Sequence, residues 1–207
     1  MNCAAKNNNI EVVLLLLKQP SIEIKPNSFQ SCTEIESITF PSWIKYIGDS
    51  ACEECINLKK VEIPSSVAKI GNFAFYDCNS LTEIIIPLSV KEIGYSAFSG
   101  CKSIKEITIP SSVTKILYST LRNCSSLKKI ELPPTLKEIG DNAFNGCSSL
   151  EVVNIPKSVT IISNFLFQGC LSLNNILLHD MITEIGCSAF ENCSALEKIL
   201  IPKGTKK

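Results

Sequence analysis

The sequence lacks an excess of charge of either sign, because its 20 Lys and Arg residues equal its 20 Asp and Glu residues. A chain without net charge has no field that attracts nucleic acid or an anionic membrane, so we expect neither as a partner. Long apolar runs are missing as well. The longest covers residues 12–17, far fewer than the ~20 residues of a membrane-spanning helix. We therefore expect no membrane span.

A recognisable export signal is also absent. One positive charge, Lys6, stands before the apolar run. The residues that follow the run, Lys18-Gln19-Pro20, are not the small residues at which a signal peptide is cleaved. The sequence by itself therefore does not predict secretion by the usual route.

Residues that carry out catalysis or bind metals are scarce. His179 is the only histidine, and the motif Cys52-Glu53-Glu54-Cys55 has no second cysteine pair at the spacing of a zinc site. The same motif is not surrounded by the βαβ pattern of a redox-active pair. Glycines occur singly, so no loop is built to hold a phosphate. We expect no enzymatic activity, no cofactor and no bound metal.

What the sequence does contain is a repeat. Eight of the eleven cysteines recur every 23 residues, and we call them the ladder cysteines: Cys32, Cys55, Cys78, Cys101, Cys124, Cys147, Cys170 and Cys193. Prolines keep the same period, with His179 in place of one of them: Pro41, Pro64, Pro87, Pro110, Pro133, Pro156 and Pro202. A fixed period over most of a chain predicts a solenoid of stacked units, and a unit of 23 residues falls in the leucine-rich-repeat range.

Each unit has a consistent internal pattern. Aliphatic residues alternate before the proline, as at Ile84 and Ile86, which predicts a strand with one buried face that ends at the proline. A short extended piece follows. A glycine such as Gly71 then predicts a turn with positive φ, and an Ala-Phe pair such as Ala74-Phe75 predicts a tight helical or 3₁₀ turn.

These units predict an α/β-type leucine-rich-repeat solenoid, mostly of β structure. We expect one parallel sheet on one side, with short turns and 3₁₀ segments on the other, and a right-handed coil because parallel crossovers are right-handed. The expected strands are residues 35–40, 58–63, 81–86, 104–109, 127–132, 150–155, 173–178 and 196–201.

The chain is expected to divide into two parts. Residues 1–20 have helical apolar spacing up to Pro20, and an apolar helix would cover the first open coil of a solenoid. Their start also resembles half of an ankyrin repeat, without the partner helix. Residues 21–207 form the solenoid itself.

The ladder cysteines are expected to be buried thiols. Equivalent residues of neighbouring coils have parallel Cβ vectors, whereas a disulfide needs vectors that converge.

Two positions depart from the repeat. Cys52 stands where other units have Phe, which predicts loose packing there, and Leu117 stands where other units have the turn glycine. Leu121 stands where other units have the larger Phe. We predict that Leu117 turns inward and fills the space that the missing ring leaves.

The repeat resembles that of the BspA-like leucine-rich-repeat surface antigens. The pattern is clearest in residues 78–98, CNSLTEIIIPLSVKEIGYSAF, and the resemblance covers residues 21–202. It implies display on a cell surface, adhesion to host proteins or cells, and in some members co-aggregation. The motif is structural throughout, so it assigns no site residues.

Two functions follow from these observations. The first is a non-catalytic surface antigen or adhesin that binds a protein, either a host protein or a second copy, along the exposed strand face. The second is an intracellular protein–protein interaction scaffold in the cytoplasm, which the missing export signal and reduced thiols favour. The oligomeric state stays open.

Four residues are candidates for partner contacts. Leu177 and Leu200 occupy the same position in the last two expected strands, a position that is mostly polar in the other strands. They are therefore either part of an interface or exposed by chance. Trp43 stands in a position that is mainly serine, and we expect it to face outward near Tyr46. This aromatic pair is either a contact site or a packing partner of the N-terminal helix.

Overall fold

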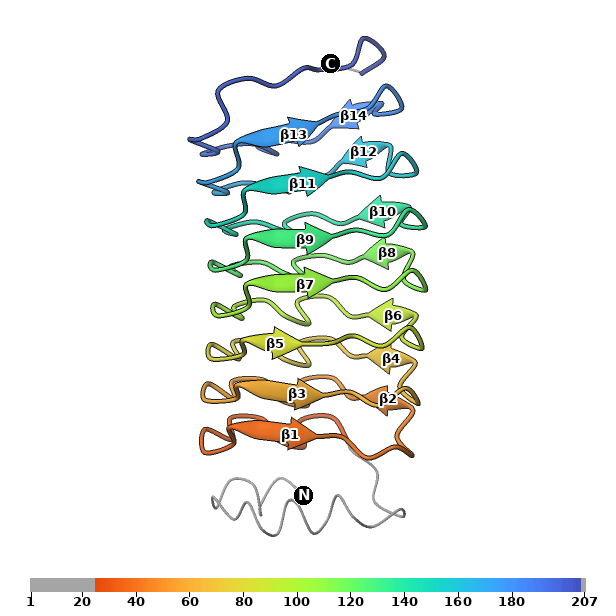
Figure 1. Cartoon of the computed structure of the whole chain (residues 1–207), viewed down its shortest axis with the longest axis vertical. Helices are drawn as coiled ribbons and strands as arrows, with labels where there is room; N and C mark the ends of the chain where they lie inside the picture. Colours follow the sequence, from red (N-terminus) through yellow and green to blue (C-terminus); the bar gives the residue numbers. More distant parts are fainter. Residues whose placement is uncertain (1–24, 206–207) are drawn as a thin grey trace.

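Two series of short parallel strands run along the molecule in the computed structural model, which describes residues 25–205 (Figure 1). The odd-numbered strands are β1 (Ser37–Thr39), β3 (Lys60–Glu62), β5 (Glu83–Ile84), β7 (Glu106–Thr108), β9 (Lys129–Glu131), β11 (Val152–Asn154) and β13 (Asn175–Leu177). The even-numbered strands are β2 (Tyr46–Ile47), β4 (Lys69–Ile70), β6 (Glu92–Ile93), β8 (Lys115–Ile116), β10 (Glu138–Ile139), β12 (Ile161–Ile162) and β14 (Glu184–Ile185).

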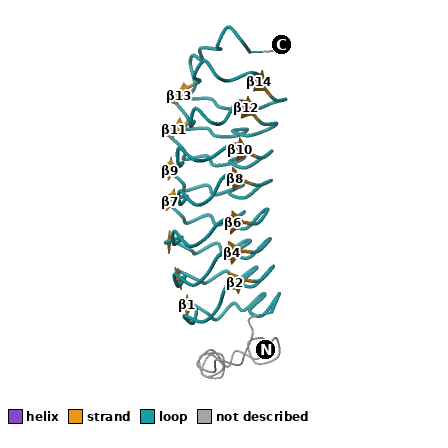
Figure 2. Cartoon of the chain, turned by 90° about the vertical axis from the view of Figure 1, so that its right-hand side faces the viewer, coloured by secondary structure: helices purple, strands orange, loops and turns teal. Residues whose placement is uncertain are grey.

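The strands pair with a shift of one repeat. Ser37 is the partner of Lys60 in the odd series, and Tyr46 is the partner of Lys69 in the even series. In Figure 1 the odd-numbered strands cross the front from left to right, and the chain returns along the even-numbered strands while it rises. Figure 2 shows the even-numbered strands set back from the odd ones. The coil is therefore right-handed, as predicted for parallel crossovers.

The solenoid and its parallel strands confirm the predicted leucine-rich-repeat architecture. Three details differ. The short piece after each proline forms a second parallel series, no helix occurs within residues 25–205, and residues 196–201 form no strand. The expected helical turns are single turns closed by i→i+3 hydrogen bonds, such as Cys55 N–H to Cys52 O at 3.2 Å. The predicted capping helix over residues 1–20 lies outside the described residues.

The core is one continuous column of apolar side chains. The middle residue of each three-residue odd strand is buried and its neighbours are exposed, as in Lys60-Val61-Glu62. Phenylalanine rings from successive coils stack, with ring centroids 5.5 Å apart for Phe75 and Phe98 and 5.6 Å apart for Phe144 and Phe167. Each coil therefore buries its apolar face only by contact with its neighbours.

The glycine at the turn is needed for close approach and not for positive φ. A Cβ on Gly71 would lie 2.6 Å from the backbone N of Asp49 in the preceding coil, which no side chain can accept. Positive φ occurs instead at two other positions of the repeat. The first comprises Asn27, Ser50, Phe73, Ser96, Ser119, Asn142, Phe165 and Ser188. The second comprises Ser31, Glu54, Asp77, Gly100, Asn123, Gly146, Gly169 and Asn192.

The prediction for Leu117 is wrong. Its side chain is 37% exposed, and its φ is not in the left-handed region. Leu121 and Thr120 are themselves fully buried, and the Thr120 hydroxyl donates a 2.8 Å hydrogen bond to the Leu117 carbonyl. The hydroxyl of the buried threonine therefore has a hydrogen-bond partner within its own turn, and the Leu117 side chain does not fill the core.

Each ladder thiol has a specific partner. The S–H of a ladder cysteine donates to the backbone carbonyl at the phenylalanine position of the preceding coil, as from Cys101 to Phe75 O at 3.1 Å and from Cys124 to Phe98 O at 3.2 Å. The same contact recurs from Cys55 through Cys193 at 3.0–3.2 Å. All eight ladder cysteines are buried and none forms a disulfide, which confirms the predicted buried thiols.

Burial of these thiols makes stability depend on pH. Desolvation raises the pKa of Cys124 to about 12, and it also raises the pKa of Cys78, Cys101, Cys147 and Cys170. An unfolded thiol titrates near ~8.5. Above that pH the unfolded chain loses protons that the folded chain retains, so the free energy of unfolding falls as pH rises.

We predict that urea unfolding in the presence of reductant shows a loss of stability that begins at about pH 8.5 and continues up to about pH 12, of up to about 1.4 kcal/mol per pH unit for each buried thiol. The variant Cys124→Ala should be less stable at neutral pH but lose less stability over this range. Cys187→Ala, which removes an exposed thiol, should match the wild type. A pH-independent unfolding midpoint would contradict the argument.

The coil that contains Cys52 also contains a large aromatic residue, Phe40. Phe40 occupies a position that is aliphatic in the other units, such as Ile63, and it is buried. Its ring lies edge-on to that of Phe75, with ring centroids 6.5 Å apart. In the phenylalanine position of the repeat, Cys52 comes between Phe29 and Phe75. A large residue thus lies in the same coil as the small Cys52, and the loose packing around Cys52 stays a prediction.

This exchange of size predicts strong coupling between the two positions. Cys52→Phe alone should destabilise the fold by about 1–3 kcal/mol through overpacking. Phe40→Ile alone should destabilise it through a cavity. The double variant should be more stable than the sum of the two effects by at least about 1 kcal/mol, measured by denaturant unfolding. Additive effects would show that the two side chains do not share one space.

Candidate functional site

The odd-numbered strands present a continuous exposed face (Figure 1). Its central position repeats through Thr39, Glu62, Ile85, Thr108, Glu131, Asn154 and Leu177, and Leu200 is the next equivalent residue. Most of these side chains are polar. Three are apolar and strongly exposed: Ile85 at 82%, Leu177 at 70% and Leu200 at 71%.

The structure places Leu177 and Leu200 on the surface, as expected for a contact site. Leu177 ends β13, the last of the odd-numbered strands. Leu200 lies in an irregular segment that does not pair with β13, and the neighbouring Ile201 is also exposed. The two leucines therefore belong to the same end of the molecule but not to one sheet.

Trp43 and Tyr46 do not form the expected exposed pair. Tyr46 is 46% exposed on β2, in the even series. Trp43 is half-buried against the core, so the prediction that it faces outward is wrong in part. Its Nε1 is buried and has no hydrogen-bond partner within residues 25–205. Strand β2, which begins at Tyr46, lies near the opposite end of the molecule from β13, which ends at Leu177 (Figure 1).

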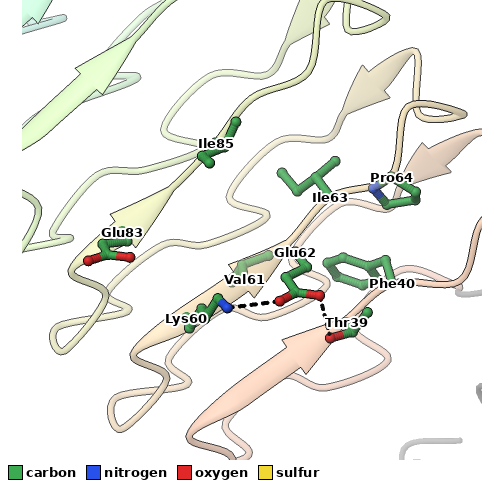
Figure 3. A pocket seen from close by; sticks show the side chains of 9 residues that line it. All are labelled: Thr39, Phe40, Lys60, Val61, Glu62, Ile63, Pro64, Glu83 and Ile85. Carbon is green, nitrogen blue, oxygen red and sulfur yellow. Dashed lines mark hydrogen bonds and ion pairs between the residues drawn. The ribbon is translucent and has the colours of Figure 1, made fainter.

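Sequence reasoning missed a hollow on the odd-strand face. It has a volume of about 450 Å³ and lies over β1, β3 and β5 (Figure 3). Its lining combines the buried Phe40 and Val61 with half-buried Ile63 and Pro64 and the exposed Ile85, while Thr39, Lys60, Glu62 and Glu83 supply the polar groups. The isoleucine at position 85, in a series that is mostly polar, was the signal available in the sequence.

Charges around this hollow are only partly neutralised. The Glu62 carboxylate accepts from Lys60 Nζ at 2.9 Å and from Thr39 Oγ1 at 3.1 Å, as Figure 3 shows. The Lys60 contact, followed by the Thr39 hydrogen bond, lowers the pKa of Glu62. Both side chains are more than half exposed, so this pair fixes side-chain positions and adds little stability. Glu83 makes no direct ion pair within residues 25–205.

No catalytic or metal centre emerges from the described part of the chain. Within residues 25–205 no group of three His, Cys, Asp or Glu side chains is placed to hold a metal ion. The Cys52 and Cys55 thiols share a hydrogen bond, which raises the pKa of Cys52 and lowers that of Cys55, but both are buried. His179 Nε2 lies 3.0 Å from the Pro156 carbonyl oxygen.

The described residues also contain no helix that is long and apolar enough to cross a bilayer.

Solved structures with this architecture come from several bacteria. A leucine-rich repeat protein from Bacteroides ovatus is 34% identical with a TM-score of 0.84, and the match covers 87% of this chain and 46% of the other. One from Eubacterium ventriosum is 30% identical with a TM-score of 0.72, and the match covers 80% of this chain and 44% of the other. The leucine-rich repeat protein of T. pallidum is 28% identical with a TM-score of 0.57, and the match covers 84% of this chain and 71% of the other.

The chain thus spans less than half the length of the Bacteroides and Eubacterium proteins. No curated protein matches its sequence. A family model does: the BspA type leucine-rich repeat region, present in six copies, matches residues 6–128 and 119–207. Together with the 23-residue register of the strands, this match shows that the chain belongs to the BspA-type leucine-rich-repeat family.

Proposed function

We propose that this chain is a non-catalytic protein-binding module that serves as a surface antigen or adhesin and binds host proteins or cells through its odd-strand face. The observation that carries the proposal is the contrast between the two sides of each strand. Inward side chains are uniformly apolar, whereas outward ones vary from coil to coil and include the exposed Ile85, Leu177 and Leu200. Variable outer residues on a fixed frame are what selective binding of a protein requires.

Membership of the BspA-type family supports the surface role. The family resemblance implies adhesion, and an extended face suits contact with a macromolecule better than with a small molecule, since the hollow over β1, β3 and β5 is not enclosed. The Leu177–Leu200 end is our first candidate for the contact, because two large apolar side chains there lie in water.

An intracellular scaffold is the second candidate. The observation that favours it is that none of the ten described cysteines forms a disulfide. Labelling intact cells that carry this protein with a membrane-impermeant biotin reagent separates the two proposals. Labelling of the chain on intact cells supports surface display. Labelling only after lysis, with a surface control labelled in both samples, supports the scaffold.

For the binding face we predict that the double variant Leu177→Asp/Leu200→Asp binds less well to the partner, or self-associates less. Burial of each leucine contributes roughly 1.5–3 kcal/mol before association costs, so the loss should be at least about tenfold. The measurements are binding of fluorescent chain to host cells and sedimentation for self-association. Because both side chains are exposed, thermal stability should change little.

Asn154→Asp is the matched control, since Asn154 is an exposed polar residue in the same position of the repeat. It should leave both association and stability unchanged. Unaltered association in the double leucine variant would show that this end takes no part in binding. A large loss of stability would show that the two leucines are needed for the fold.

A further inference from the structure

Cys52 and Cys55 place two thiols within one turn of the solenoid. In the other units the residue three positions before the ladder cysteine is large and apolar: Phe29, Phe75, Phe98, Leu121, Phe144, Phe167 and Phe190. Cys52 takes this inward position and is 1% exposed, whereas Cys55 is 0% exposed. The repeat therefore directs both cysteine side chains of this turn into the core.

The turn that joins the two cysteines brings them within disulfide range. The Cys55 N–H donates to the Cys52 carbonyl at 3.2 Å, and Glu54 lies in the left-handed region with a φ of 58°. The end residues of such a four-residue turn have Cα atoms less than about 7 Å apart, and a disulfide joins Cα atoms about 4.4–6.8 Å apart. The two thiols also share a hydrogen bond. The side chains therefore converge, as a disulfide requires.

Thiols of neighbouring coils are arranged differently. Cys32 and Cys78 are the equivalents of Cys55 in the adjacent coils, so the Cβ vectors of the three residues are parallel. The Cys55 S–H donates to the Phe29 carbonyl at 3.0 Å, and the Cys78 S–H donates to the Cys52 carbonyl at 3.1 Å. A disulfide between Cys55 and Cys78 would remove both of these hydrogen bonds from the core.

A disulfide within the turn disturbs less of the fold. It removes the hydrogen bond from the Cys55 thiol to the Phe29 carbonyl, and that carbonyl still accepts the Cys32 N–H at 3.1 Å. The Cys52 carbonyl keeps both of its donors, the N–H of Cys55 and the S–H of Cys78. The alignment of the coils is therefore preserved when the two sulfurs are joined.

The two thiols differ in reactivity. Their shared hydrogen bond lowers the pKa of Cys55 and raises the pKa of Cys52. Because the thiolate is the nucleophile in exchange with a disulfide, Cys55 is the attacking residue of the pair. Both thiols are buried, so exchange takes place when the coils around them open locally.

We propose that Cys52 and Cys55 form a reversible disulfide by exchange with a small-molecule disulfide such as oxidised glutathione. The Cys55 sulfur attacks the small disulfide and releases one small thiol, and the Cys52 sulfur then displaces the second from Cys55. The two leaving thiolates take up the two cysteine protons, so the pair loses two electrons and two protons and the small disulfide gains them.

This inference goes beyond the proposed protein-binding function and does not depend on it. Structural disulfides persist in oxidising surroundings and are reduced in a cytosol. The pair is therefore oxidised in a surface antigen and reduced in an intracellular scaffold.

The test equilibrates the folded chain with graded ratios of oxidised to reduced glutathione, quenches exchange with acid, and alkylates the remaining thiols after unfolding. Trypsin, which cleaves after Lys45 and Lys59, releases residues 46–59 with both cysteines of the pair and no other. We expect mass spectrometry to show this peptide unalkylated and lighter by the two thiol hydrogens. The exposed Cys187 shows that the oxidant acts, because it should form a mixed disulfide with glutathione.

The fold should favour this disulfide over its formation in the unfolded chain. The same titration in urea should require a ratio of oxidised to reduced glutathione about tenfold higher, because the unfolded chain does not hold the turn closed. Cys52→Ala should abolish the unalkylated peptide. Cys78→Ala is the matched control, since it removes a ladder thiol of the next coil and should leave the disulfide in residues 46–59 unchanged.

Three results overturn the proposal, and the first is measured on the wild-type chain. Residues 46–59 carry two alkylated cysteines at every ratio that modifies Cys187, or cross-linked peptides join Cys55 to Cys32 or Cys78, or the folded chain and the chain in urea are oxidised at the same ratio. None of these results bears on binding to host cells, so the proposed protein-binding function stands or falls separately.

Discussion

Alignment of every coil with the coil 23 residues before it is the constraint on which the rest of the structure depends. A ladder thiol such as Cys101 donates to the carbonyl of Phe75, and that carbonyl already accepts the N–H of Cys78 at 3.3 Å. Both acceptor positions of a buried carbonyl are thereby satisfied without water. A shift of register would leave these groups unpaired in the core, at a cost of about 1–3 kcal/mol each.

The same alignment explains which substitutions the repeat tolerates. Inward positions are shared between adjacent coils, so a change of size at one must be compensated at another, as we predict for Phe40 and Cys52. The turn glycines tolerate no Cβ where the coils approach within contact distance. Outward positions contact the next coil only at the surface, as Thr39 does Glu62, so they are free to differ in size from coil to coil and to carry specificity.

Binding and stability therefore depend on separate residues of one repeat. Ile85 and Leu177 occupy the outward position next to buried Ile84 and Ile176. A change at the outer residue alters what the face contacts, and a change at the inner one alters the core.

The sequence by itself determined the period, the inward positions, the proline-ended strands and the buried thiols, because each is a local pattern repeated in register. Only the tertiary structure decided the second strand series, the positions of positive φ, the half-burial of Trp43 and the hollow beside Ile85. It also decided that residues 196–201 form no strand and that Leu117 faces water. These features depend on the contacts between adjacent coils, and the residue pattern of a single unit does not specify those contacts.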